Sequence, residues 1–264
     1  AYEGKMTVPR SLTLTAIPGL PEVKPGDDLA ALIATAVEGS ALSVQDNDIF
    51  VIAQKIVSKS EGRLVNLSTV QPSPKALEIA KTVEKRPELV ELILQESNSV
   101  LRMRPGTIIV EHRSGFVCAN AGIDHSNVQG AWGDPSDWVL LLPEDADRSA
   151  QAIRAGLEAH FGKHLGVLII DSYGRAWRNG IIGMSIGLSG MPALVDMRGK
   201  QDRNGYALRV TVIAAADELA AGASLMMGQA AEGTPVVLAR GFPYELAEDQ
   251  ASRLVRSKQS DLFR

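Results

Sequence analysis

Short turns between strand-forming segments constrain the fold of this chain most strongly. The segments 100–103, 107–110 and 115–117 are apolar or β-branched, and only a few residues separate each from the next. Parallel strands need a crossover connection of about a dozen residues or more, so strands joined this closely must pair antiparallel. The sequence therefore predicts an antiparallel three-stranded unit near the middle of the chain.

Helical and further strand-forming segments lie on both sides of this unit. Apolar periodicity and capping residues predict helices from about Asp28 with an acidic first turn, from Ser73-Pro74, from about Pro87, over 145–161 ending at Gly162, and over 216–227. Further strands are expected over 12–17, 48–53, 139–142, 167–170, 210–214 and 236–239. Helices and strands do not alternate regularly, which favours an α+β fold with largely antiparallel sheets.

Length and charge exclude several classes of protein. A chain of 264 residues fits one large domain or two intertwined subdomains. The net charge of -4 gives no basic surface for nucleic acid. No apolar run approaches the ~20 residues that span a bilayer. The single cysteine, Cys118, allows no internal disulfide, is expected to be an inert core residue, and suits a reducing cytoplasm.

Several common catalytic motifs are absent from the sequence. There is no G-x-x-x-x-G-K-[ST] phosphate loop, no G-x-G-x-x-G after a strand and no G-x-S-x-G nucleophile turn. His160 and His164 are four residues apart, but Gly162 between them should end the helix, so they do not form a zinc pair. P-loop nucleotide folds, serine hydrolases and zinc enzymes are therefore disfavoured.

Two polar clusters in the first half of the chain suggest binding of anions and cations. Gln54 and Lys55, with Lys59, follow an apolar strand, and lysines at such a place neutralise phosphate oxygens. Asp124 and Asn127 follow the strand that ends near Val117, and carboxylate and amide oxygens suit magnesium or manganese. Taken alone, the first cluster is equally consistent with a solvated surface turn and the second with an Asx-turn.

Two more clusters lie in the second half. Asp171 and Ser172 follow a buried strand and could share a metal, while Arg175 and Arg178 could clamp a phosphate or carboxylate. The loop 227–234 is rich in small residues that allow close approach to a ligand, and its backbone N–H groups could cradle phosphates. A tight turn with surface arginines and a simple helix-ending loop are the alternatives. Together the four clusters supply the groups needed for metal-assisted phosphoryl transfer.

The same clusters resemble those of the coenzyme F420-0:L-glutamate ligase (gamma-glutamyl ligase) family. The motifs that carry the resemblance are GDDL, KIVSKSEGR, NAGIDHSN, DSYGRAWRNGIIGMSIGLSG and MGQAAEGTP, in this order along the chain. The resemblance extends from Ile17 to Gly241. It implies a fold of two interleaved subdomains over residues 1–246, followed by a tail over 247–264, without a P-loop.

The resemblance also implies an activity and its partners. Such an enzyme uses GTP to join L-glutamate to the lactyl carboxylate of coenzyme F420-0 and then adds glutamates through gamma linkages. Its members use magnesium or manganese at two sites, with potassium as a further candidate cation, and form homodimers. Some relatives are fused to a nitroreductase-like domain, so the chain is expected to act alone or beside such a domain, fused or separate. No nucleic acid or membrane partner is implied.

Motif by motif, the resemblance assigns roles to residues of this chain. The GTP contacts would be Leu20, Pro21, Glu22, Val23, Gln54, Lys55, Lys59, Asn127, Met227, Gly228, Gln229, Ala230, Ala231, Glu232, Gly233 and Thr234. The metal ligands would be Asp124, Asp171, Ser172 and Gln229. Three features depart from the family pattern: Glu22 replaces an aliphatic residue, Gln229 replaces a glutamate, and the segment 130–137 is longer than in short members.

These assignments suggest a mechanism and leave two alternatives open. Metals at Asp124 and Asp171 would offset negative charge while the substrate carboxylate takes the gamma-phosphoryl group of GTP. Lys55 or Lys59 would stabilise the anionic oxygens. Arg175 and Arg178 are inferred, from their charge alone, to hold the coenzyme. The alternatives are a non-catalytic nucleotide-binding module and an ATP-dependent ligase acting on another carboxylate.

Overall fold

A five-stranded sheet forms the centre of the molecule, and a computed structural model describes it together with the rest of residues 10–128 and 130–262. Its strands lie in the order β1 (Thr13–Ala16), β12 (Val236–Arg240), β2 (Ile49–Ala53), β8 (Gly166–Arg175) and β9 (Arg178–Ser189). Only β2 and β8 run parallel; the other neighbours are antiparallel. The predicted α+β class with mostly antiparallel sheets is confirmed.

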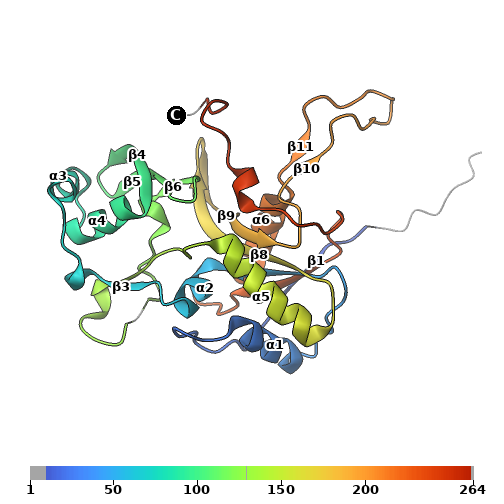
Figure 1. Ribbon diagram of the computed structural model, residues 1–264, viewed down its shortest axis with the longest axis horizontal. Coiled ribbons are helices and arrows are strands. Elements are labelled where there is room, and N and C mark those ends of the chain that lie inside the picture. Colours follow the sequence, from blue (N-terminus) through green and yellow to red (C-terminus); the bar gives the residue numbers. More distant parts are fainter. Residues whose placement is uncertain (1–9, 129, 263–264) are drawn as a thin grey trace, which may run out of the picture.

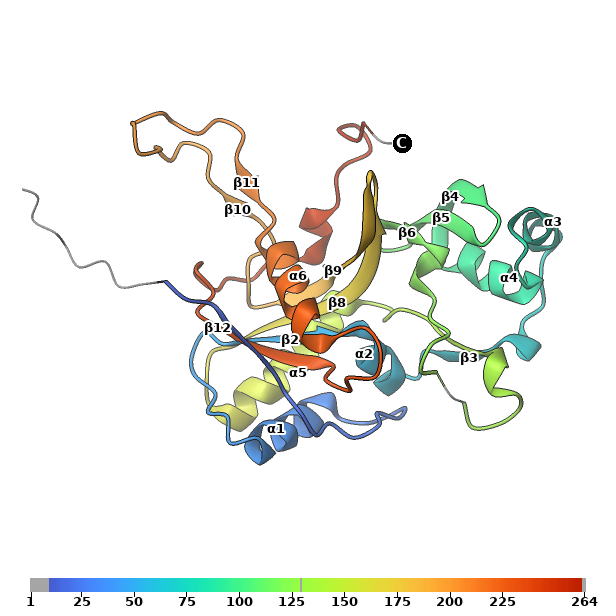
Figure 2. The ribbon, with the colours of Figure 1, turned by 180° about the vertical axis from the view of Figure 1, so that it is seen from behind.

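Helices cover both faces of this sheet, as Figure 1 and Figure 2 show. On one face α1 (Leu29–Gly39) and α5 (Ala146–Phe161) pack with the larger apolar core, which contains Phe50 and Leu157. On the other face α6 (Ala215–Met227) packs against a second apolar cluster that contains Ile49 and Leu168. Alternate residues of a strand point to opposite faces, so β2 and the first half of β8 (166–170), covered on both sides, are apolar, and polar residues begin at Asp171.

A second group of elements is inserted between β2 and β8 and lies at the side of the sheet (Figure 1). It contains the predicted antiparallel unit, formed by β4 (Ser97–Arg104), β5 (Thr107–His112) and β6 (Val117–Ala119). The helices α3 (Pro74–Val83) and α4 (Pro87–Gln95) pack with it, and β3 (Leu64–Asn66) pairs with β7 (Trp138–Leu140). Cys118 is buried in β6 as predicted, and burial raises the pKa of its thiol to about 12.

Two smaller features complete the described chain. The strands β10 (Val195–Asp196) and β11 (Val212–Ile213) pair, and the loop between them extends away from the sheet (Figure 2). Short 3-10 turns occur at 67–69, 120–122, 135–137 and 251–254. Within the described ranges, no helix combines the length and the apolar character that crossing a membrane would require.

The structure corrects several local predictions. Gln54–Ser60 forms a helix, α2, where the sequence predicted no helix after the strand; its buried face carries Ile56 and Val57. The strand expected to end at Ile170 continues to Arg175, because it pairs along its whole length with β9 in a long hairpin. The strand expected over 210–214 is shorter and comprises only β11. Asp28 is the N-cap of α1 and lies outside the helix, and therefore α1 has no acidic residue in its first turn.

Side chains block the outer edge of β9. The backbone N–H of Gly183 donates to Ser224 Oγ at 3.2 Å, that of Ser185 to Asp217 Oδ1 at 3.0 Å, and that of Leu188 to Asp147 Oδ1 at 2.8 Å. Asp147 and Asp217 belong to the first turns of α5 and α6, where a carboxylate is also favoured by the helix dipole. These contacts satisfy edge groups that would otherwise be free to pair with another strand.

Close packing of α5 on β9 predicts the effect of one substitution. A Cβ added at Gly187 would lie 2.4 Å from the backbone carbon of Ala146, so Gly187→Ala should force α5 away from the sheet. Overpacking of this kind costs about 1–3 kcal/mol of the free energy of unfolding, measurable by urea denaturation. Gly174→Ala is the control, because Gly174 is in the same hairpin and has no atom within 4 Å of such a Cβ. Equal stability of the two variants would contradict the packing.

Candidate active site

The parallel pairing of β2 and β8 creates the candidate site. Ala53 lies opposite Ile170 in this pair, so the residues that follow them, Gln54 and Asp171, emerge at the same edge of the sheet. The loop after α6 leads into β12, which pairs with β2 on its other side, and so reaches the same edge. A cavity of about 760 Å³ opens there, lined by residues of α2, β8 and this loop together with Asp124 and Asn127.

Asp124 is brought to the cavity from the inserted group. Its backbone N–H and carbonyl both bond to Leu140 at 2.9 Å, which fixes the segment after β6 beside β7. Its carboxylate accepts a hydrogen bond from Gln54 Nε2 at 2.8 Å and lies 3.5 Å from Lys55 Nζ. An Asx-turn does not account for these contacts, because both partners belong to α2, some seventy residues earlier in the chain.

Asp171 has an unusual protonation equilibrium. Burial, with the neighbouring negative charge of Asp124 as the second cause, raises the pKa of Asp171 from its usual value to about 7. The backbone N–H of Ser172 donates to Asp171 Oδ1 at 2.7 Å and opposes this rise without cancelling it. Two carboxylates that disfavour each other's charge in one cavity are typical of a site that receives a cation.

The helix α2 holds the cationic side of the cavity. Ser58 Oγ donates to Gln54 Oε1 at 2.9 Å and so leaves the Gln54 amide N–H group directed at Asp124. Lys55 Nζ donates to the carbonyl of Ser126 at 2.8 Å, and buried Lys59 forms an ion pair with Glu22. The two lysines are therefore fixed along one wall, within the same cavity as both carboxylates.

The loop after α6 has the form of an anion-binding nest. Gly228, with φ of 73°, ends the helix, and Thr234 Oγ1 donates to the carbonyl of Met227 at 3.2 Å. The backbone N–H of Ala230 donates to the carboxylate of Glu232 at 2.8 Å. Backbone N–H groups of Ala230, Glu232 and Gln229 lower the pKa of the Glu232 carboxyl. These N–H groups therefore converge on a carboxylate, in the way that such loops bind phosphate.

The donor set fits a hard divalent cation. Asp124, Asp171, Ser172 and Gln229 all line the cavity and present oxygen atoms, and Ser172 Oγ already donates to Gln229 Oε1 at 2.8 Å. Magnesium and manganese prefer such carboxylate, hydroxyl and amide oxygens. Among the described residues, no cluster of three or more His, Cys, Asp or Glu side chains could hold a metal ion. A metal site in this cavity would therefore also need the Ser172 hydroxyl and the Gln229 amide oxygen as ligands.

Most residues singled out in the sequence meet in this cavity, but some do not. Lys55, Lys59, Gln54, Asn127 and Glu22 line it, together with Met227, Gly228, Gln229, Ala230, Ala231, Glu232, Gly233 and Thr234. Leu20, Pro21 and Val23 are not among the lining residues, and Val23 is buried in the core. Arg175 and Arg178 lie at the far end of the β8–β9 hairpin, where Arg175 Nη1 donates to the carbonyl of Gly180.

Sequence reasoning missed Ser126 and Tyr173, which also line the cavity. Ser126 lies between Asp124 and Asn127 in the sequence and receives two hydrogen bonds from Lys55. Tyr173 lies two residues after Asp171 on β8, so both side chains leave the strand on the same face. The predicted strand ended at Ile170, and a strand predicted to reach Arg175 would have revealed this.

Comparison with known proteins shows which family the chain belongs to. The family model described as F420-0:Gamma-glutamyl ligase matches residues 19–241, a range that includes every residue lining the cavity. The chain belongs to the F420-0:gamma-glutamyl ligase family. This confirms the resemblance found in the sequence motifs. The matched range also contains the inserted group, Asp124 and Asp171.

Individual members of the F420-0:gamma-glutamyl ligase family are similar over almost their whole length. The protein named coenzyme F420:L-glutamate ligase of Methanopyrus kandleri is 43% identical over 258 residues, which cover 96% of this chain and 98% of the relative. The protein of the same name from Methanothermobacter thermautotrophicus is 44% identical, with 96% and 99% covered. That of Archaeoglobus fulgidus is 40% identical, with 94% of each chain covered.

The raised pKa of Asp171 predicts how stability depends on pH. The folded protein holds the Asp171 proton more tightly than the unfolded chain does, so this carboxyl lowers the free energy of unfolding as pH rises from about 4 to about 7. Asp171→Asn removes this pH-dependent decrease in the free energy of unfolding, because asparagine does not ionise. Without divalent cations the variant should be more stable than the wild type at pH 8 by about 1–4 kcal/mol, and the difference should vanish near pH 4.

Calorimetry or urea denaturation of both proteins across this pH range measures the difference. Asp196→Asn is a suitable control, because Asp196 is an exposed carboxylate paired with Arg198 far from the cavity. Here the paired arginine lowers the pKa of the carboxyl to about 2, so the effect of the control substitution is complete above about pH 4 and should stay constant from pH 4 to pH 8. A stability difference for Asp171→Asn that does not change with pH would contradict the account.

Proposed function

We propose that this protein is a GTP-dependent ligase that adds L-glutamate to coenzyme F420-0, first at the lactyl carboxylate and then through gamma-glutamyl linkages, forming GDP. The names of its relatives support the substrate, since they are coenzyme F420:L-glutamate ligases at 40–44% identity. The observation that carries the chemistry is the single cavity that joins two carboxylates, two lysines and an anion-binding loop. Phosphoryl transfer needs these groups in one place.

The reaction follows from the roles of these groups. The loop 228–232 would hold phosphate oxygens of GTP through backbone N–H groups, and Lys55 and Lys59 would stabilise charge on them. An oxygen of the acceptor carboxylate attacks the gamma-phosphorus, the bond to GDP breaks, and an acyl phosphate results. The amine of glutamate then attacks the acyl carbon, loses a proton and displaces phosphate.

Divalent cations would be held by Asp124, Asp171, Ser172 and Gln229. Magnesium or manganese bound there supplies positive charge that offsets the charge of the transferring phosphoryl group. In this chain the carboxylates act as fixed ligands, and Gln54 and Ser172 orient them through the hydrogen bonds already present. Two metal sites, a potassium ion, a homodimer, a cytoplasmic location and a nitroreductase-like partner domain stay predictions from the family resemblance.

Glu232 would have to leave the loop before phosphate enters it. Its carboxylate accepts the Ala230 N–H group, and the side chain is exposed, so a change of rotamer suffices to release it. Lys55 would likewise exchange its contact with the Ser126 carbonyl for a phosphate oxygen. These contacts hold the loop and Lys55 in place until a nucleotide replaces them.

The ligase proposal predicts a product ladder. Incubation of the protein with coenzyme F420-0, L-glutamate, GTP and manganese should give products that each gain one glutamyl residue, visible by mass spectrometry. No product should form without GTP. Asp171→Asn should lower the rate by at least about a hundredfold, because removal of one electrostatic group from a phosphoryl-transfer site commonly costs this much.

Separate outcomes distinguish the alternatives. GTP that binds in calorimetry without any glutamylated product would support a non-catalytic nucleotide-binding module. Equal product with ATP in place of GTP would contradict GTP specificity but keep a carboxylate–amine ligase. Full activity of Asp171→Asn would contradict the role given to the paired carboxylates.

A further inference from the structure

The C-terminal segment joins two parts of the molecule that form different sides of the candidate active site. Asp171 and the loop after α6 belong to the central sheet and its helices, whereas Asp124 comes from the inserted group. The segment 248–258, which we call the C-terminal strap, contacts both parts beside β9. The matched family range ends at residue 241, so the family match assigns the strap no role.

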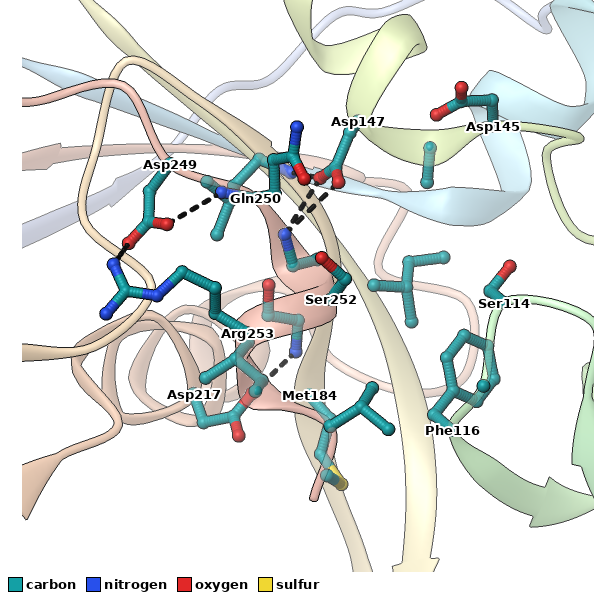
Figure 3. A pocket seen from close by; sticks show the side chains of 18 of the residues that line it. Ser114, Phe116, Asp145, Asp147, Met184, Asp217, Asp249, Gln250, Ser252 and Arg253 are labelled. Atoms are coloured by element: carbon teal, nitrogen blue, oxygen red, sulfur yellow. Dashed lines mark hydrogen bonds and ion pairs between the residues drawn. The ribbon is translucent and has the colours of Figure 1, made fainter. Parts of the chain in front are cut away.

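Hydrogen bonds fix the first half of the strap to the sheet side. The backbone N–H of Ala251 donates to both carboxylate oxygens of Asp147, each at 3.2 Å. Asp249 Oδ2 accepts the backbone N–H of Ala193 at 3.0 Å. Figure 3 shows Asp147 and Asp249 at this end of the strap. Ala251 is also buried in the second apolar cluster, and Leu254 packs against it, so this end of the strap is held by polar and apolar contacts together.

The second half of the strap contacts the inserted group. Lys258 Nζ lies 3.1 Å from Glu111 Oε2, and the Glu111 side chain is only 6% exposed. Asn98 Nδ2 donates to the other carboxylate oxygen of Glu111 at a longer distance, 3.3 Å. Val255 packs over the turn before β6, since a Cβ added at Gly115 would lie 3.7 Å from Val255 Cγ1. A buried carboxylate is unfavourable without a positive partner, so the ion pair holds the end of the strap against β5.

Glu111 is connected by one strand pairing to the segment that carries Asp124. It lies on β5, the middle strand of its sheet, opposite Val117 of β6. The chain continues from β6 through the turn 120–122 to Asp124, which bonds to Leu140. The strap therefore holds the pair of strands from which Asp124 is delivered to the active site.

Between its two attachments the strap spans a cavity of about 1320 Å³. Figure 3 shows Phe116 of the inserted group across from Asp217 of α6, with Ser252 of the strap between them. A space of this size gives no packing contact between the inserted group and the sheet. Nearer the active site, Phe116 packs on Tyr173 with 5.5 Å between the ring centroids. On the side of β9 the strap therefore supplies the connection that side-chain packing does not.

We propose that the C-terminal strap positions the candidate active site, with the Lys258–Glu111 ion pair holding the inserted group where Asp124 meets Asp171. Without this pair the inserted group keeps its chain connections and its contacts at the active-site cavity, but Asp124 occupies a wider range of positions relative to Asp171. Lys258 and Glu111 act through Asp124, so they are positioning residues and touch no reactant. The assignment rests on the proposed function for the role of the two carboxylates, and it adds the residues that set their separation.

Lys258→Ala tests the proposal, because Lys258 is the exposed partner of the ion pair and its loss leaves both apolar clusters intact. Hydrogen–deuterium exchange, measured by mass spectrometry without substrates, should become faster over residues 117–127 by about fivefold or more, while β2 and β8 exchange as in the wild type. Lys258→Arg should restore the wild-type exchange, because arginine can pair with the same carboxylate. Lys75→Ala, a change of an exposed lysine on α3 of the inserted group, is the matched control.

The sheet-side end of the strap offers a second variant. Ala251→Pro removes the N–H group that donates to Asp147, and the backbone accepts proline there because Gln250 before it is extended, with φ of -136° and ψ of 143°. Exchange should again become faster over residues 117–127, although the substitution lies on the sheet side. An effect of Ala251→Pro confined to the strap and α5 would contradict the coupling of the two ends.

Steady-state kinetics connect the strap to the reaction. Lys258→Ala should lower kcat by about tenfold, because small displacements of a positioned group have effects of this size, while Lys258→Arg and Lys75→Ala keep the wild-type kcat. Unchanged exchange over 117–127, equal acceleration of β2 and β8, or faster exchange with a wild-type kcat would overturn the proposal. The exchange experiment needs no substrate, so absence of ligation by a wild type whose strap variants exchange as expected would contradict the proposed function alone.

Discussion

The parallel pairing of β2 with β8 is the constraint on which the rest of the structure depends. It is the one parallel contact of the central sheet, and parallel neighbours need a long crossover between them. This crossover carries α2, the inserted group and α5. Because the carboxyl ends of β2 and β8 meet at one edge, Gln54 and Asp171 become neighbours, and the inserted group delivers Asp124 to them.

The site combines groups that are unfavourable together in the absence of a ligand. Burial and the negative charge of Asp124 raise the pKa of Asp171, so the paired carboxylates cost stability near neutral pH, and a bound cation would relieve this. Glu232 instead stabilises the empty loop through its hydrogen bonds, and a phosphate would have to replace it. The apolar clusters on the two faces of the sheet supply the stability that makes these costs tolerable.

How far the sequence predicts this arrangement depends on the range of the interactions involved. Local signals were sufficient for α3, which starts at Ser73-Pro74, and for the antiparallel unit built on short turns. They failed for α2, whose helical state depends on burial of Ile56 and Val57, and for the extension of β8 beyond Asp171, which requires β9 as a partner. Periodicity in one segment contains no information about these distant contacts.

The same limit applies to the site residues. Asp124 and Asp171 were selected because polar residues follow apolar strands, and the structure brings them into one cavity. Tyr173 and Ser126 were missed because each is unremarkable in its own segment. Arg175 and Arg178 were selected for charge alone, yet the hairpin carries them away from the cavity lining. Charge in a motif thus predicts a site only where the topology of the fold is also known.

Manganese binding followed by electron paramagnetic resonance tests the central claim most directly. If Asp124 and Asp171 form one cation site with the nucleotide, the wild type should bind manganese in the presence of GTP. Asp124→Asn and Asp171→Asn should each weaken that binding by at least about tenfold, while Asp202→Asn, a change of an exposed carboxylate on the loop between β10 and β11, should not. Equal manganese affinity in all four proteins would contradict the account.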